Sequence, residues 1–188
     1  MNRPGPADAS AVSRRVLVLG GARSGKSAFA ESLLDGHDGV QYVATSKPDP
    51  EDAEWRERVT AHRLRRPAGW ATIETGDLAA IYAGSDPAPA LIDSLTGWLT
   101  RLLDENGAWQ NRPGWRQRVE DGIDALVSAV RSSGRHSIAV SDEVGSGIVP
   151  ESAAGRLFRD LLGTLNQRVA GEADEVWLVT AGIGSRLR

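Results

Sequence analysis

Residues 20 to 27 read Gly-Gly-Ala-Arg-Ser-Gly-Lys-Ser and have the spacing G-x-x-x-x-G-K-[ST]. The apolar run 15–19 before them predicts a buried strand, and residues 27–34 after them are typical of the first turns of a helix. Between a strand and a helix, the backbone N–H groups of such a loop surround a polyphosphate. We therefore predict a nucleoside triphosphate site in which Lys26 reaches the terminal phosphates and the Ser27 hydroxyl binds Mg²⁺. The predicted loop consists of Gly20, Gly21, Ala22, Arg23, Ser24, Gly25, Lys26 and Ser27.

Composition excludes several other classes of protein. The chain has 188 residues, a net charge of −3 and no cysteine. It therefore has no bulk basicity for nucleic acid, no disulfide and no cysteine nucleophile, and no apolar run approaches the ~18 residues of a membrane helix. Residues 1–13 are rich in Pro, Ala, Ser and Asp, and we expect a disordered extension rather than a signal peptide. Residues 14–188 are predicted to form one cytoplasmic enzyme domain with no nucleic-acid partner and no membrane span.

Strand-like and helix-like segments alternate along the rest of the chain. This alternation predicts an α/β fold, a mostly parallel sheet flanked by helices. The segment 104–114 carries Asn, Gly, Gln, Trp and Pro, and is expected to be an exposed loop or a partner surface. Further strands are predicted at 40–44, 71–74, 90–92, 136–141 and 176–180, and further helices at 51–65, 115–132 and 156–169.

Carboxylates follow two of the predicted strands. The run Ala90-Leu91-Ile92 ends on Asp93, as in the Walker B element whose carboxylate holds Mg²⁺ in phosphate-loop enzymes. The segment 141–150 places two acids and two glycines after another strand, at the edge where open α/β sheets bind ligands. An ordinary turn with a capping acid explains this second segment equally well.

Three basic residues share the spacing of one helical face, namely Arg58, His62 and Arg66. Two guanidinium groups beside an imidazole suit phosphate binding or attack on phosphorus, because they neutralise phosphate oxygens. From spacing alone, a solvated basic face is the better interpretation. A second open question is the role of Trp98, Trp109 and Trp115. The sequence allows three interpretations, namely packing in the core, lining a flat apolar ligand, and a contact between subunits.

Several motifs together resemble the family of bifunctional adenosylcobinamide kinases / adenosylcobinamide-phosphate guanylyltransferases of cobalamin biosynthesis. The similarity covers nearly all of residues 15–185, and its most specific parts are the histidine segment and the E-V-G-x-G-I-V-P-E run. The matching pieces are residues 20–27, Tyr42-Val43-Ala44-Thr45-Ser46, Arg58-Val59, His62-Arg63, Arg66-Pro67-Ala68, Trp70, Glu143-Val144-Gly145, the run 147–151, Phe158-Arg159-Asp160, Asn166-Gln167-Arg168 and the run 173–177.

The resemblance implies a RecA-like P-loop NTPase with two activities. It would phosphorylate adenosylcobinamide with ATP or GTP and then transfer GMP from GTP to adenosylcobinamide phosphate, releasing pyrophosphate. Covalent catalysis splits the second reaction into two easier displacements, and the family's guanylylated histidine falls on His62. The implied partners are the two corrinoids, the nucleotides, Mg²⁺ and two further copies of the chain in a homotrimer. Besides the loop, the implied nucleotide-site residues are Thr45, Ser46, Arg63, Arg66, Glu74 and Asp93, with Asp93 the choice for Mg²⁺.

The chain departs from the family pattern at two positions. Ala61 stands where some members have a second histidine, and Gly69 stands where many have the histidine of Arg-Pro-Ala-His-Trp. The second change puts a secondary contact in doubt and leaves the covalent step unaffected. Alternatives are a guanylyltransferase whose kinase activity is lost, a different small-molecule kinase, and a GTP-binding regulatory protein. The chain lacks an Asn-Lys-x-Asp guanine-reading motif, which counts against the last.

Overall fold

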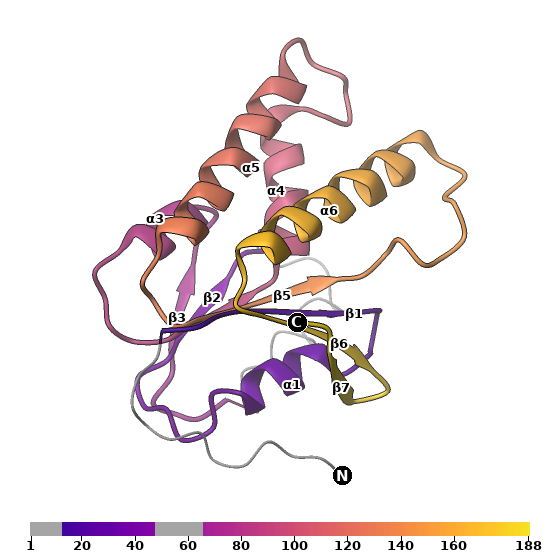
Figure 1. Ribbon diagram of the computed structural model, residues 1–188. Helices are drawn as coiled ribbons and strands as arrows, with labels where there is room; N and C mark the ends of the chain where they lie inside the picture. The colour runs from indigo at the N-terminus through magenta and orange to yellow at the C-terminus, as the bar shows by residue number, and fades with distance from the viewer. Residues whose placement is uncertain (1–12, 48–65) are drawn as a thin grey trace.

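The computed structural model describes residues 13–47 and 66–188 of the chain. Within these ranges the chain forms a seven-stranded sheet in the order β3-β2-β4-β5-β1-β6-β7 (Figure 1). The first six strands pair in parallel, and β7 pairs antiparallel to β6. The strands are β1 (Arg15–Gly20), β2 (Gln41–Ala44), β3 (Ala71–Glu74), β4 (Ala90–Asp93), β5 (Ser137–Asp142), β6 (Glu175–Thr180) and β7 (Ile183–Arg186).

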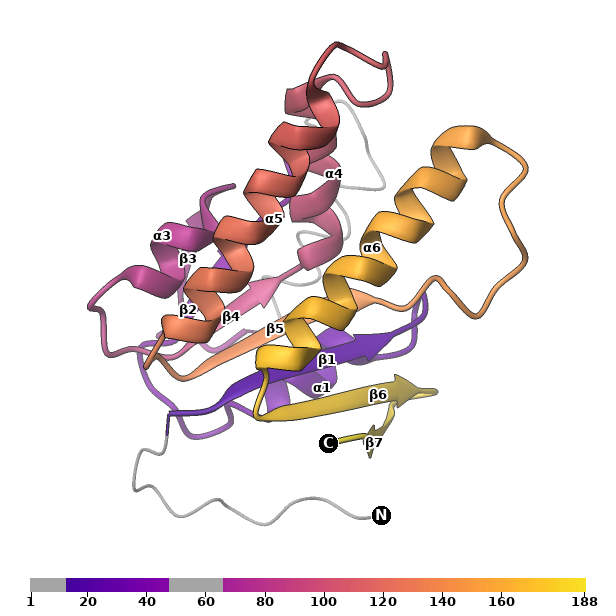
Figure 2. The same ribbon diagram turned by 45° about the horizontal axis from the view of Figure 1, so that its top comes forward.

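Helices cover both faces of this sheet. α1 lies against one face, and α3, α4, α5 and α6 lie against the other (Figures 1 and 2). Parallel strands need such crossover helices, and the burial on both faces explains the apolar runs in β1, β4 and β5. The helices are α1 (Lys26–Ser32), α3 (Leu78–Ala83), α4 (Leu95–Asn106), α5 (Trp115–Ser132) and α6 (Ala153–Glu172).

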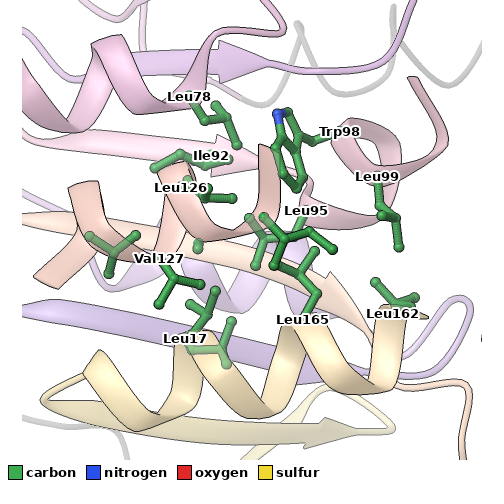
Figure 3. Close-up of a cluster of buried hydrophobic side chains, with 14 of the residues drawn as sticks. Leu17, Leu78, Ile92, Leu95, Trp98, Leu99, Leu126, Val127, Leu162 and Leu165 are labelled. Atoms are coloured by element: carbon green, nitrogen blue, oxygen red, sulfur yellow. The ribbon is translucent and has the colours of Figure 1, made fainter. Parts of the chain in front are cut away.

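The larger of the two apolar cores lies between the sheet and α3–α6. Leu17 and Ile92 from the sheet meet Leu95, Leu126 and Leu165 from three helices, and all five are at most 1% exposed (Figure 3). A smaller cluster packs α1 against the opposite face. The two clusters hold β1, β4 and β5 rigidly, and these strands end at the loop and at the two carboxylates discussed below.

The structure confirms the predicted α/β class and the mostly parallel sheet. The strand 71–74 and the helix 115–132 lie where the sequence predicts them, and the strand ending at Asp93 does too. The prediction of a helix over 51–65 falls outside the described residues. The helices α3 and α4 and the final strand β7 were not predicted.

The predicted exposed segment 104–114 is irregular only after its first three residues. α4 extends to Asn106, so the irregular part begins only after it. Trp98 and Trp115 are 5% and 4% exposed and belong to the core, the first of the three interpretations that the sequence left open. Their indole N–H groups donate to the carbonyl of Gly76 at 2.9 Å and to the side chain of Asn111 at 3.0 Å. Burial with a satisfied N–H is the ordinary role of a core tryptophan.

Candidate nucleotide-binding site

The glycine-rich loop connects β1 directly to α1. Gly25 precedes the helix with φ +89°, a backbone conformation that glycine adopts without strain. Gly20 lies too close to its surroundings for any side chain, because a Cβ there would be 2.7 Å from the Val179 carbonyl oxygen and would also overlap the Ser24 hydroxyl. The two glycines therefore allow a turn that no larger residue permits, and the loop has the strand–turn–helix context that phosphate binding requires.

The β6–β7 turn is bonded to this loop. The Gly182 N–H donates to the Ser24 carbonyl at 2.7 Å, and a Cβ on Gly25 would lie 3.1 Å from the Gly182 Cα. Ala181 and Gly182 both have positive φ, as in the tight turns that match the twist of a hairpin. Sequence reasoning missed this contact. The only local signal is the Ala-Gly pair after an apolar strand.

Asp142 lies beside the loop because β5 is the neighbour of β1. The two strands are in register with Gly20 opposite Asp142, and Lys26 Nζ contacts Asp142 Oδ1 at 2.5 Å. The same ammonium donates to the Gly21 carbonyl at 3.3 Å. The main chain of Asp142 is held on two sides, by Thr96 Oγ1 accepting its N–H at 2.9 Å and by Asn166 Nδ2 donating to its carbonyl at 3.0 Å. Asp142 belongs to the segment 141–150 that the sequence places at the ligand-binding edge, but it was not among the residues assigned to the nucleotide site.

Asp93 ends β4, which is separated from the loop strand by β5 alone. The Tyr42 hydroxyl donates to Asp93 Oδ2 at 2.7 Å. Burial, together with the Asp93 charge, raises the pKa of Tyr42 far above its usual range, so the phenol keeps its proton and donates at every physiological pH. This bond orients the carboxylate at the edge where the parallel strands end.

The predicted Mg²⁺ ligands fit the ion by their chemistry. The Ser27 hydroxyl follows the loop lysine at the start of α1, and Asp93 supplies a carboxylate at the same sheet edge. Oxygen ligands suit Mg²⁺, which keeps several waters and uses one or two carboxylates together with substrate phosphates. The described residues contain no group of three or more His, Cys, Asp or Glu able to form a protein-only metal cage, and this substrate-shared mode of binding does not need one.

Thr45 and Ser46 lie where β2 meets the turn after β4. The Thr45 hydroxyl donates to the Ser94 carbonyl at 2.6 Å and accepts the Ser94 N–H at 3.0 Å, and Thr45 is fully buried. The first turn of α4 approaches them closely, because a Cβ on Gly97 would be 3.0 Å from Thr45 Oγ1 and would overlap the Ser46 hydroxyl. In this structure the Thr45 hydroxyl fastens β2 to the Asp93–Ser94 turn.

Arg66 and Glu74 lie near the edge strand β3, away from the strand that carries the phosphate-binding loop. Glu74 ends β3, four strands from β1, or about 19 Å at the usual spacing of strands. The Arg66 guanidinium carbon lies 3.6 Å from the centre of the Tyr42 ring, and Arg66 Nη1 donates to Thr72 Oγ1 at 3.1 Å. Arg66 therefore touches the tyrosine that binds Asp93. His62 and Arg63 lie outside the described residues.

The segment after β5 combines both interpretations that the sequence left open. Asp142 faces the loop lysine, whereas the Glu143 carboxylate accepts the N–H of Gly145 at 2.7 Å and that of Ser146 at 3.3 Å, as a turn cap does. Arg159 donates to the Gly145 carbonyl at 2.7 Å. The same loop then carries Ile148, whose side chain is 96% exposed.

Comparison with protein families and known proteins gives a consistent result. The profile of the family described as cobinamide kinase / cobinamide phosphate guanyltransferase matches residues 16–187. The chain is similar to the bifunctional adenosylcobalamin biosynthesis protein CobU of Salmonella typhimurium (39% identity, 92% of this chain and 99% of that protein) and that of Escherichia coli (38%, 92% and 99%). It is also similar to the corresponding CobP protein of Pseudomonas aeruginosa (35%, 93% and 97%).

A solved structure supports the fold independently. An ATPase of the type III secretion system of pathogenic bacteria superposes with a TM-score of 0.58 at 12% identity, over 93% of this chain and 57% of that one. At this identity the likeness concerns the fold alone, and it agrees with the predicted α/β fold around a mostly parallel sheet.

Proposed function

The chain belongs to the cobinamide kinase / cobinamide phosphate guanyltransferase family, and from that premise we propose that it catalyses both reactions of the family's name. It phosphorylates adenosylcobinamide with ATP or GTP. It then transfers GMP from GTP to adenosylcobinamide phosphate, giving adenosylcobinamide-GDP and pyrophosphate. The observation that carries the proposal is the site geometry, in which a phosphate-binding loop, its lysine and two carboxylates share one edge of the sheet.

Phosphate binding begins with the loop. The backbone N–H groups of residues 20–27 and the Lys26 ammonium bind the phosphates of either nucleotide, and Lys26 neutralises charge on the phosphoryl group that is transferred. Ser27 and Asp93 would hold Mg²⁺, which when bound supplies further neutralisation of the phosphate oxygens. Phosphoryl transfer has little covalent chemistry for a protein to perform, so positioning and electrostatics of this kind account for most of the catalysis.

Guanylyl transfer requires a nucleophile that the loop does not contain. We assign it to His62, which shares a four-residue spacing with Arg58 and Arg66. An imidazole nitrogen of His62 attacks the α-phosphorus of GTP, and the bond to pyrophosphate breaks. A phosphate oxygen of adenosylcobinamide phosphate then attacks the same phosphorus and breaks the P–N bond, which frees the histidine. The contact of Arg66 with Tyr42, the partner of Asp93, supports this assignment because it connects the basic segment with the metal-binding side of the site.

Two alternative functions make different predictions. A guanylyltransferase that has lost its kinase activity would label His62 but leave cobinamide unphosphorylated. A GTP-binding regulatory protein would bind GTP without any covalent product. Family membership favours the bifunctional enzyme over both.

The proposal extends to assembly and location. We propose a cytoplasmic homotrimer, on the family resemblance. Trp98 and Trp115 are buried within the chain and cannot supply its interface, so the contacts between subunits must use other residues. No helix among the described residues is long and apolar enough to cross a bilayer.

Incubation with α-labelled GTP and Mg²⁺, without corrinoid, tests the central step. Wild-type protein should retain an acid-labile label after denaturation, and His62→Ala should retain none. His37→Ala is the matched control, because His37 lies in the loop before β2, at the opposite end of the strands from the phosphate-binding loop. This variant should label like wild type. A wild-type protein that binds GTP but takes no label would refute the transferase mechanism.

A further inference from the structure

We propose that Asp142 is a catalytic residue of the kinase reaction and accepts the proton of the acceptor hydroxyl when that oxygen attacks the terminal phosphate. The inference rests on the proposed kinase function. It assigns a chemical role to a carboxylate that the proposed function counts as part of the site but gives no step, and it starts from the 2.5 Å contact between Asp142 Oδ1 and Lys26 Nζ.

The position of Asp142 follows from the strand order. β5 lies directly beside β1, and the register pairs Asp142 with Gly20, the first residue of the loop. Lys26, which its carboxylate touches, is the residue that reaches the terminal phosphates in loops of this kind. The Asp142 carboxylate and the phosphoryl group that is transferred are therefore both neighbours of the Lys26 ammonium. Asp93 is one strand farther from β1 and has a hydroxyl partner of its own, so the two carboxylates have separate surroundings.

The contact must change when a nucleotide binds. In the structure, Lys26 divides its N–H groups between Asp142 and the Gly21 carbonyl. A bound triphosphate brings several anionic oxygens to the same ammonium, and these oxygens compete with the carboxylate for it. Asp142 is then left beside the transferable phosphate as an acceptor-only group whose oxygens can take a proton from a hydroxyl.

Two main-chain hydrogen bonds hold the backbone that carries this carboxylate during the exchange. Thr96 on α4 accepts the Asp142 N–H, and Asn166 on α6 donates to the Asp142 carbonyl. Neither bond involves the carboxylate, so Lys26 can leave without releasing the end of β5. A proton acceptor needs this fixed position, because proton transfer requires hydrogen-bond distance to the reacting oxygen.

The chemical step balances without a further reactant. The hydroxyl oxygen of adenosylcobinamide forms a bond to the terminal phosphorus, and the bond from that phosphorus to the bridging oxygen of the nucleotide breaks. The nucleoside diphosphate leaves with the electron pair of the broken bond. The hydroxyl proton moves to an Asp142 carboxylate oxygen and from there to solvent.

Asp142→Asn in the full-length protein tests the assignment, since asparagine keeps the size of the side chain and both main-chain bonds. Two activities are measured separately, namely phosphorylation of cobinamide and corrinoid-free labelling of the protein with GMP. Cobinamide phosphorylation should lose about 100-fold in kcat. Nucleotide binding should become about fivefold tighter, because the competing charge on Lys26 is gone. GMP labelling should remain within threefold of wild type. The kinase kcat of Asp142→Glu should be at least tenfold higher than that of Asp142→Asn.

Asp174→Asn provides the matched control. Asp174 also forms an ion pair, with Arg15 Nη2 at 2.9 Å. Arg15, however, begins β1, at the opposite end of the strand from the phosphate-binding loop. This variant should keep both activities. An Asp142→Asn enzyme whose kinase kcat stays within threefold of wild type would overturn the assignment, as would an equal loss of both activities with weaker nucleotide binding. Wild-type protein that labels with GMP but phosphorylates no cobinamide would refute the proposed kinase function itself.

Discussion

The Gly182 N–H donates to the Ser24 carbonyl at 2.7 Å and so bonds the β6–β7 hairpin to the middle of the phosphate-binding loop. The contact joins the first strand–loop–helix unit to the last hairpin in the chain. The loop conformation therefore depends on a residue far away in the sequence, and changes in that hairpin should affect nucleotide binding.

Gly182→Ala should weaken nucleotide binding several-fold. Gly182 has φ +78°, and a Cβ there meets nothing within 4 Å, so the effect comes from backbone strain of about 1 kcal/mol. Relief of that strain moves the N–H away from Ser24. Calorimetric titration with GTP measures the change. Gly36→Ala is the control, because it introduces the same backbone strain at φ +86° in open space on another loop. Both variants should have a similarly lowered melting temperature, but Gly36→Ala should leave the Kd for GTP unchanged.

Gly97→Ala should destabilise the protein by roughly 1–3 kcal/mol, the usual cost of overpacking. The new Cβ would lie 3.0 Å from Thr45 Oγ1 and would overlap the Ser46 hydroxyl, at a point where α4, β2 and the turn after Asp93 meet. Urea unfolding measures the loss. Gly163→Ala in α6 is the control, because its Cβ meets nothing within 4 Å and alanine is the better helix former. That variant should be as stable as wild type or more stable by up to about 1 kcal/mol.

Tyr42→Phe should raise the Mg²⁺ concentration that gives half-maximal activity by about fivefold. The change removes the hydroxyl that orients Asp93, a hydrogen bond to a charged group, and leaves the ring beneath Arg66. Titration of the kinase rate with Mg²⁺ measures the shift. Tyr82→Phe removes the hydroxyl of a buried tyrosine in α3 and should leave the Mg²⁺ dependence as it is. Equal Mg²⁺ dependence in Tyr42→Phe and wild type would contradict a role for the Tyr42–Asp93 hydrogen bond in metal binding.

The folded protein should lose stability as the pH falls below about 6.5, the ordinary pKa of histidine. Burial is the main reason that the pKa of His136 is lowered in the folded state, whereas its Nδ1 contact with the Arg14 carbonyl, at 3.0 Å, opposes the shift. Above this pH both states carry a neutral ring and the stability is complete. Below it the unfolded chain takes up a proton more readily than the folded one, so unfolding becomes easier.

Urea unfolding of wild type and His136→Gln between pH 7.5 and 5 tests this prediction. The variant should lose less stability over that interval than wild type. Asp174, whose pKa is lowered mainly by its hydrogen bonds with Arg15, contributes only at lower pH, near and below the ordinary pKa of aspartate, so it does not interfere. An identical slope in both proteins would exclude His136 as the source.

Local patterns predicted the elements that depend on local chemistry. The Ala90–Asp93 strand is recognisable because an apolar run ends on an acid, and α5 because its apolar residues recur at helical spacing over 18 residues. The glycine spacing of the loop was likewise sufficient, since the positive φ at Gly25 is the conformation for which glycine is needed.

The missed features depend on which strands are neighbours. Nothing in the spacing of residues says that β5 lies between β1 and β4, and only that order brings Asp142 to Lys26. The Gly182–Ser24 bond has the same origin. Trp98 differs, because helical spacing joins it to the buried leucines of α4 and indicates a core position, and the turn-rich composition of the residues that follow obscured that pattern.

The two main-chain hydrogen bonds of Asp142 bear on which residues this position accepts. Thr96 and Asn166 form hydrogen bonds with the main-chain N–H and carbonyl of this residue, and neither bond involves its side chain. Any small polar residue can therefore occupy the position without disturbing the path of β5. A single codon change at this position would therefore alter the charge beside the loop lysine while the scaffold stays intact.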